Sequence, residues 1–146
     1  MAQGDAKYLR DFPLKLNRGD YNVLNTYSLV FLSDTYSLVN VDATNPALGD
    51  FTETTGGNIS KTVLANVTIT RAGTEIKFDA DDPATFLKDA LNPADVRTLM
   101  IINDTVSDDA AQVFDATVDG TTPLDLINND LTISFSASGF MTITLT

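Results

Sequence analysis

Hydrophobic and polar residues alternate with a period of two over several stretches of the chain, and this pattern predicts β-strands. The alternation is clearest near the C-terminus, where apolar residues occupy every second position of residues 131–135 and again of residues 141–145. An Ala-Ser-Gly turn at residues 137–139 separates the two segments. We therefore expect an antiparallel hairpin with one apolar face.

Other segments also have strand patterns. Residues 63–71 and 75–79 alternate around an Ala-Gly-Thr turn and predict a second hairpin. Residues 27–32 form a run rich in aromatic and aliphatic residues between turn signals, which predicts a strand. Residues 98–103 are apolar at all four central positions, which predicts a strand buried on both faces. Residues 113–119 alternate once more and end at a turn.

About six short strands with turn signals between them predict an all-β fold, either a compact antiparallel β-sandwich or a barrel-like domain. Residues 1–146 are expected to form this single domain. Within it, residues 1–20 are expected to be a short N-terminal arm or helix. Residues 33–61 are expected to be a long contact loop.

The N-terminal segment has a mixed pattern. Apolar residues recur at near-helical spacing within residues 6–17, but Pro13 interrupts them. A short helix and an ordered arm that packs on a neighbouring subunit both fit this pattern. Removal of residues 1–17 is expected to leave a folded domain that no longer assembles.

Two further segments are harder to interpret. The contact loop at 33–61 is too long to be wholly featureless, and residues 38–41 are expected to pair briefly as a strand. Residues 82–91 are expected to form a short helix. Its inward-facing residues would be Phe86, Leu87 and Leu91.

The composition narrows the chemistry available to the protein. The chain has no Cys, His or Trp, so thiolate catalysis and the commonest general base and metal ligand are absent. Acidic residues outnumber basic ones 20 to 9, and the net charge of −11 argues against binding to nucleic acid or to an anionic membrane. No signal-peptide pattern is present, so we expect a soluble protein made in a cytosol. Because Cys and His are missing, we also expect no enzymatic activity and no cofactor.

Clustered aspartates are the remaining candidates for catalytic or metal-binding groups. Asp79, Asp81 and Asp82 lie close together in the sequence, as do Asp108 and Asp109. Two carboxylates across a cleft could serve a glycosidase, and the first cluster could hold a structural cation such as Ca²⁺. The complete pattern of a calcium-binding loop is missing, and we expect these residues to be solvated loop positions with no bound metal.

The order of segments resembles a group of small structural virion proteins of tailed bacteriophages. The matching segments are Lys7-Tyr8-Leu9, Ser33-Asp34-Thr35-Tyr36, Gly49-Asp50-Phe51-Thr52-Glu53, Gly56-Gly57, residues 62–73, residues 76–82 and Ser136-Ala137-Ser138-Gly139. The resemblance implies a non-enzymatic capsid decoration (cement) protein that binds the outside of the phage head. Such a protein is made in the host bacterial cytoplasm and resides on the virion.

The resemblance also implies partners. These are the major capsid protein or another virion protein, together with further copies of this chain in a homo-oligomer. A tail, neck or fibre-base component is an alternative, and a carbohydrate- or receptor-binding β module is another. Neither nucleic acid nor a membrane is expected as a partner.

A few aromatic and aliphatic side chains are expected to anchor the interface with a partner. The candidates in the arm and in the contact loop are Tyr8, Leu9, Phe12, Leu14, Tyr36 and Phe51. The alternative for each of them is that it completes the core of its own domain.

Overall fold

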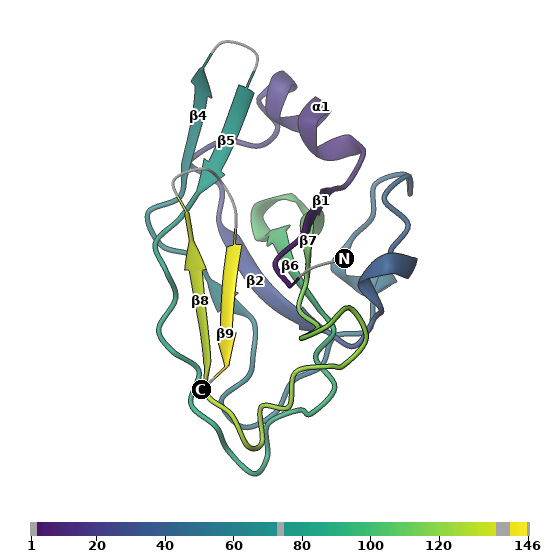
Figure 1. The fold of residues 1–146 in the computed structure, drawn as a ribbon. Helices are drawn as coiled ribbons and strands as arrows, with labels where there is room; N and C mark the ends of the chain where they lie inside the picture. Colours follow the sequence, from purple (N-terminus) through teal and green to yellow (C-terminus); the bar gives the residue numbers. More distant parts are fainter. Residues whose placement is uncertain (1–2, 73–74, 137–140, 146) are drawn as a thin grey trace.

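A computed structural model describes residues 3–72, 75–136 and 141–145 of the chain. The regular secondary structure of these residues is mainly β-strand, with one α-helix and three short 3₁₀ helices (Figure 1). The strands are β1 (Ala6–Tyr8), β2 (Tyr27–Leu32), β3 (Thr62–Val63), β4 (Thr68–Ala72), β5 (Glu75–Asp79), β6 (Thr98–Asn103), β7 (Asp109–Asp115), β8 (Leu131–Phe135) and β9 (Met141–Leu145). The helices are α1 (Asp11–Arg18), η1 (Tyr36–Leu38), η2 (Leu48–Asp50) and η3 (Asp104–Val106).

Five of the strands form one antiparallel sheet in the order β1-β7-β6-β2-β3. The hairpins β4–β5 and β8–β9 are separate two-stranded sheets. The predicted all-β class and the predicted C-terminal hairpin are therefore confirmed, and the other predicted hairpin is present with a first strand that begins at Thr68. Within the described residues the five-stranded sheet ends at β1 and β3 without closing, so the fold is sandwich-like and not a barrel.

Both faces of the central sheet are covered. On one face, Phe78 of β5 and Ile133 of β8 belong to the same buried cluster as Leu29 and Leu99 of the sheet, so the two hairpins pack there (Figure 1). On the other face, sheet residues cluster with side chains of the segment that follows β2. Those covering side chains are Tyr36, Val39, Val41, Leu48 and Phe51. The predicted contact loop is therefore also one layer of the core.

This double cover explains why every residue of β2, β6 and β7 is buried. Two-sided burial was predicted for residues 98–103 and is confirmed. The alternating strand predicted at 113–119 is wrong, because β7 runs from Asp109 to Asp115 and has no exposed face. A bulge places Gln112 opposite Ile101 and Ala110 opposite Ile102, which breaks the alternation of the strand.

The N-terminal segment combines a strand and a helix. β1 pairs with β7 at the edge of the sheet, and α1 follows it. Pro13 lies in the first turn of α1, where its missing N–H would have had no partner within the helix. Leu9 packs on one face of the sheet and Phe12 on the other, so the segment wraps around the sheet edge. Of the two structures expected for this segment, the short helix is present as α1, and Leu9 and Phe12 are part of the core.

Three other predictions also need correction. Residues 82–91 form no helix. Phe86 instead pairs with Leu131 of β8 through two backbone hydrogen bonds, which requires an extended backbone. Leu87 and Leu91 are exposed instead of facing inward. Residues 38–41 do not form a strand, because η1 ends at Leu38 and residues 39–41 are irregular. Residues 63–71 split into β3 and β4, which belong to different sheets, while the tip of the β4–β5 turn and residues 137–139 lie outside the described residues.

Candidate functional site

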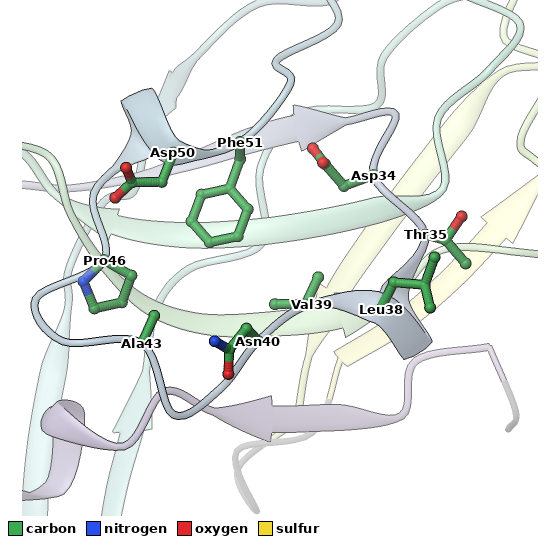
Figure 2. A pocket seen from close by; sticks show the side chains of 9 residues that line it. All are labelled: Asp34, Thr35, Leu38, Val39, Asn40, Ala43, Pro46, Asp50 and Phe51. Atoms are coloured by element: carbon green, nitrogen blue, oxygen red, sulfur yellow. The ribbon is translucent and has the colours of Figure 1, made fainter.

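A pocket of about 300 Å³ opens within the segment that covers the sheet. Its lining residues are Asp34, Thr35, Leu38, Val39, Asn40, Ala43, Pro46, Asp50 and Phe51. All of them come from one continuous stretch of chain, residues 34–51, which we call the pocket segment. Figure 2 shows the ring of Phe51 between Asp34 and Asp50, opposite Val39.

The ends of the pocket segment are held by hydrogen bonds. The Asp34 carboxylate accepts the backbone N–H of Thr52 at 2.6 Å, which brings the start and the end of the segment together. The Thr98 hydroxyl of β6 donates to the Asp34 carbonyl at 2.6 Å and fixes that end to the sheet. The Asp50 carboxylate accepts the N–H of Ala47 at 2.9 Å and closes the turn of η2. The two carboxylates at the pocket therefore also stabilise its walls.

The N-terminal segment supports the far side of the pocket segment. The backbone N–H of Arg10 donates to the Val41 carbonyl at 2.8 Å. The Asp11 carboxylate accepts the N–H of Asn45 at 2.9 Å. This backbone hydrogen bond holds the pKa of Asp11 below its ordinary value. The Lys7 ammonium donates to the Tyr36 carbonyl at 3.1 Å and lies 4.3 Å from the centre of the Tyr36 ring.

The β6–β7 turn and the start of β7 also form hydrogen bonds with the pocket segment. The N–H of Leu48 donates to the Asp108 carbonyl at 3.0 Å, and the N–H of Ala110 donates to the Pro46 carbonyl at 2.8 Å. Ser107 and Asp108 both have a φ of 53°, a left-handed conformation that brings this tight turn against the pocket segment. The pocket thus lies in a loop fixed at both ends and in the middle, which favours a preformed site.

The pocket combines apolar walls with negative charge. Among the apolar lining residues, Leu38 is 80% exposed, Val39 is buried and Phe51 is half-buried. Residues 34–51 contain three aspartates and no Lys or Arg. Such a surface suits a ligand or side chain with an apolar part and a positive charge.

The six predicted anchor residues fall into two groups. Leu9, Phe12 and Tyr36 are buried in the core, so they cannot contact a partner in this conformation, and the prediction is corrected for them. Burial also raises the pKa of Tyr36 to about 12. Tyr8 and Leu14 are exposed on the N-terminal segment, and Phe51 lines the pocket.

Sequence reasoning identified the loop that holds the pocket but missed most of the residues that line it. Asp34 and Asp50 are 16 positions apart and belong to no recognised motif. Leu38 carried only a weak signal, since single apolar residues are common on protein surfaces and Leu24 and Leu91 are also highly exposed. That signal could not place the two carboxylates beside it.

The other aspartate clusters are dispersed by the fold. Asp81 accepts a hydrogen bond from Asn66 at 2.6 Å, whereas Asp82 accepts one from the backbone N–H of Phe135 at 2.7 Å. Asp108 and Asp109 separate as well, because Asp108 lies near Lys61 and Asp109 binds Lys15. In the part of the chain that the structure describes, no three acidic residues come together as ligands for a metal ion.

One ionic network outside the pocket involves a carboxylate with a displaced pKa. Lys61 binds Asp104 at 2.6 Å and lies 3.5 Å from Asp108, and the Ser28 hydroxyl also donates to Asp104. Burial alone would raise the pKa of Asp104, but the hydrogen bonds from Lys61 and Ser28 hold it below its ordinary value. This network joins Ser28 of β2, Lys61 just before β3 and the β6–β7 turn, and its geometry is that of a structural brace.

Across residues 3–72, 75–136 and 141–145, no helix has both the length and the apolar character needed to cross a membrane. Comparison with protein-family models, with curated proteins and with solved structures finds no match for this chain.

Proposed function

We propose that the chain is a non-enzymatic structural virion protein, and specifically a capsid decoration protein that binds the outside of a phage head. The observation that carries this proposal is the pocket segment, a rigidly held loop that presents apolar walls and two carboxylates to solvent. A surface of this kind is suited to binding another protein. The resemblance of the sequence to small virion proteins supplies the class of partner.

The roles of the carboxylates support a structural function. Asp119 accepts hydrogen bonds from the backbone and side chains of Thr121 and Thr122, and these hold its pKa far below the ordinary value. Hydrogen bonds also hold the pKa values of Asp104 and Asp11 below their ordinary value. Each of these carboxylates accepts hydrogen bonds that fix a turn or join neighbouring segments, which is a structural role.

A decoration protein must bind the same contact at many equivalent positions on the shell. A preformed loop loses little conformational entropy on each binding event, so every contact retains more of its gross interaction energy. The hydrogen bonds that fix residues 34–51 to β6, β7 and the N-terminal segment provide this property. The absence of Cys makes folding independent of an oxidising compartment.

The test is to mix the purified chain with expanded, undecorated capsids assembled from the major capsid protein of the same genome. We expect cryo-electron microscopy to show regular added density on the outer surface, contacted by residues 34–51, and the shells to resist heat better. Bare shells, with the protein left in solution, would overturn the decoration role. Density on isolated tails in a parallel grid would then assign the chain to the tail.

A matched pair of variants tests whether the pocket makes the contact. Leu38 and Leu24 are both highly exposed leucines, 80% and 90% respectively, but only Leu38 lines the pocket. We expect Leu38→Ala to reduce occupancy on the shells by about tenfold, the effect of losing a central contact residue. Leu24→Ala should bind like the wild-type protein. Equal occupancy for both variants would place the contact elsewhere on the molecule.

A further inference from the structure

We infer that the pocket in residues 34–51 receives an arginine side chain from the partner protein. This inference rests on the proposed function, because it names the chemistry of the group that the decoration protein would bind. It is drawn from the charges, walls and hydrogen bonds of the pocket segment.

The charge of the pocket is the first argument. Asp34 and Asp50 line it, Asp42 is exposed on the same segment, and residues 34–51 include no cation. The chain as a whole has a net charge of −11, so its field favours the approach of a positively charged surface. A neutral apolar occupant would remove water from two carboxylates without compensating them, which is costly.

Neighbouring cations do not neutralise these carboxylates. Lys7 is directed to the carbonyl and ring of Tyr36. Arg10 lies 3.6 Å from the Asp11 carboxylate and donates to the Thr44 hydroxyl at 3.4 Å. Among the residues described by the structure, neither Asp34 nor Asp50 has an ion-pair partner. The pocket therefore retains negative charge that an incoming cation would balance.

The hydrogen bonds of the two carboxylates leave acceptor capacity for a ligand. Asp34 accepts from Thr52 through Oδ2, and Asp50 accepts from Ala47 through Oδ2. A carboxylate has about four lone-pair sites on its two oxygens, so one backbone hydrogen bond does not saturate it. Because these bonds also fix the side chains, the acceptors are already positioned when a cation arrives.

The apolar walls favour arginine as the cation. Leu38 and Val39 offer a surface for the aliphatic stem of a long side chain, and the Phe51 ring lies between the two aspartates (Figure 2). A planar guanidinium can stack on an aromatic ring while its fork of N–H groups donates to carboxylates. It is also less strongly hydrated than an ammonium group, and arginine is enriched at protein interfaces.

The first test uses a small probe on the full chain. N-acetyl-arginine amide is titrated into isotope-labelled protein, and amide resonances are followed by NMR, with N-acetyl-citrulline amide as a neutral probe of nearly the same shape. We expect shifts confined to residues 34–51 and their immediate neighbours with the arginine probe, and much smaller shifts with citrulline. Equal responses to the two probes would overturn the inference, because they would show that charge does not matter.

Three variants locate the charge that is recognised, two at the pocket and one control outside it. In Asp34→Asn and Asp50→Asn the new amide oxygen can still accept the backbone N–H of Thr52 or Ala47, so the loop is preserved. Asp42→Asn removes the same charge from an exposed position that does not line the pocket. We expect Asp34→Asn to weaken binding of the arginine probe about three- to fivefold, the size of an exposed ion pair, and Asp42→Asn to have little effect. Equal weakening by these two variants would overturn the inference.

Capsid binding separates this inference from the proposed function. If the wild-type protein decorates shells and Asp34→Asn does so as well as Asp42→Asn, the arginine pocket is excluded while the decoration role stands. If the wild-type protein binds the arginine probe through the pocket but leaves shells bare, the pocket stands and the decoration role is excluded. Selective loss of decoration in Asp34→Asn supports both.

Discussion

Lys15 of α1 forms an ion pair with Asp109 at the start of β7, and both side chains are nearly buried, 14% and 8% exposed. The Tyr21 hydroxyl donates to the Asp109 carbonyl at 3.4 Å, and the Lys15 ammonium lies 5.8 Å from the centre of the Tyr21 ring. The pair therefore joins the helix to the sheet through two side chains that are each mostly covered. Its loss should be felt as a loss of stability.

Replacing Lys15 with methionine keeps the apolar stem but leaves the Asp109 carboxylate without its cation. Because that carboxylate is nearly buried, we expect Lys15→Met to lower the free energy of unfolding by about 3 kcal/mol. Urea denaturation at neutral pH measures this change. The control is Lys61→Met, whose side chain is 42% exposed beside Asp104, and which should cost no more than about 1 kcal/mol. Equal losses in the two variants would contradict the buried role of the first pair.

Asn92 is a second internal brace, which joins three segments through its side chain. Its amide donates to the carbonyls of Leu87 and Leu126, each at 2.9 Å, and its carbonyl oxygen accepts the N–H of Asn58 at 2.8 Å. Asn92→Asp keeps the shape but turns two donors into acceptors that face carbonyl oxygens. We expect a loss of about 3 kcal/mol, because the buried Leu126 carbonyl loses its donor, the Leu87 carbonyl keeps only the Asn58 side-chain donor, and a charge is buried.

Asn40→Asp is the matched control for this substitution. Asn40 is exposed and uses only its carbonyl oxygen, which accepts the N–H of Asp42 at 3.0 Å, so an aspartate can replace it in that role. We expect its unfolding midpoint in urea to stay close to that of the wild-type protein. Similar destabilisation by the two substitutions would mean that added charge, and not the lost donors, causes the effect.

Elements stabilised by local patterns were predictable from the sequence, and elements that depend on distant partners were not. The two hairpins and β6 have a period-2 or fully apolar pattern that appears within a few residues. The start of β7 was missed because Asp109 and Gln112 are polar yet buried, and a bulge interrupts the alternation. Residues 82–91 were misassigned because their conformation depends on pairing with Leu131, far along the chain.

The candidate site was only partly predictable, for a related reason. An aromatic or aliphatic residue outside a regular strand can complete a core or contact a partner, and the sequence does not distinguish these uses. The structure assigns Leu9 and Tyr36 to the core, and it places Phe51 at the pocket. The pocket itself depends on hydrogen bonds between carboxylates of an irregular loop and backbone groups up to 18 positions away. Such hydrogen bonds leave no periodic pattern in the sequence.

The packing of the N-terminal segment gives a direct test of whether it is separable. Leu9 is 0% exposed and Leu14 is 44% exposed, although they lie only five positions apart. We expect Leu9→Ala to cost about 3 kcal/mol, through lost burial and the cavity left behind, and Leu14→Ala to cost less than about 1 kcal/mol. For the same reason, deletion of residues 1–17 should abolish cooperative thermal unfolding. A truncated chain that still unfolds cooperatively, as monitored by circular dichroism, would restore the view of an independent arm.

Three buried tyrosines make the fold sensitive to alkaline pH. Burial raises the pKa of Tyr27 and Tyr36 to about 12, and burial together with the Asp109 carboxylate raises that of Tyr21 as well. Above an ordinary tyrosine pKa of about 10, the unfolded chain releases these protons while the folded chain keeps them. Stability is therefore fully present below about pH 10 and falls as the pH rises toward 12, by up to about 2 kcal/mol for each group.

We expect the absorbance of tyrosinate and the loss of β-sheet circular dichroism to rise together in a pH titration through this range. Tyr36→Phe removes one of the groups whose ionisation drives unfolding, and it keeps the ring that packs on the sheet. Its unfolding midpoint should therefore move to higher pH, while its stability at neutral pH stays close to that of the wild-type protein. If all the tyrosines instead ionise near pH 10 while the circular dichroism is unchanged, the buried rings are accessible to solvent and the packing described for Tyr21, Tyr27 and Tyr36 is wrong.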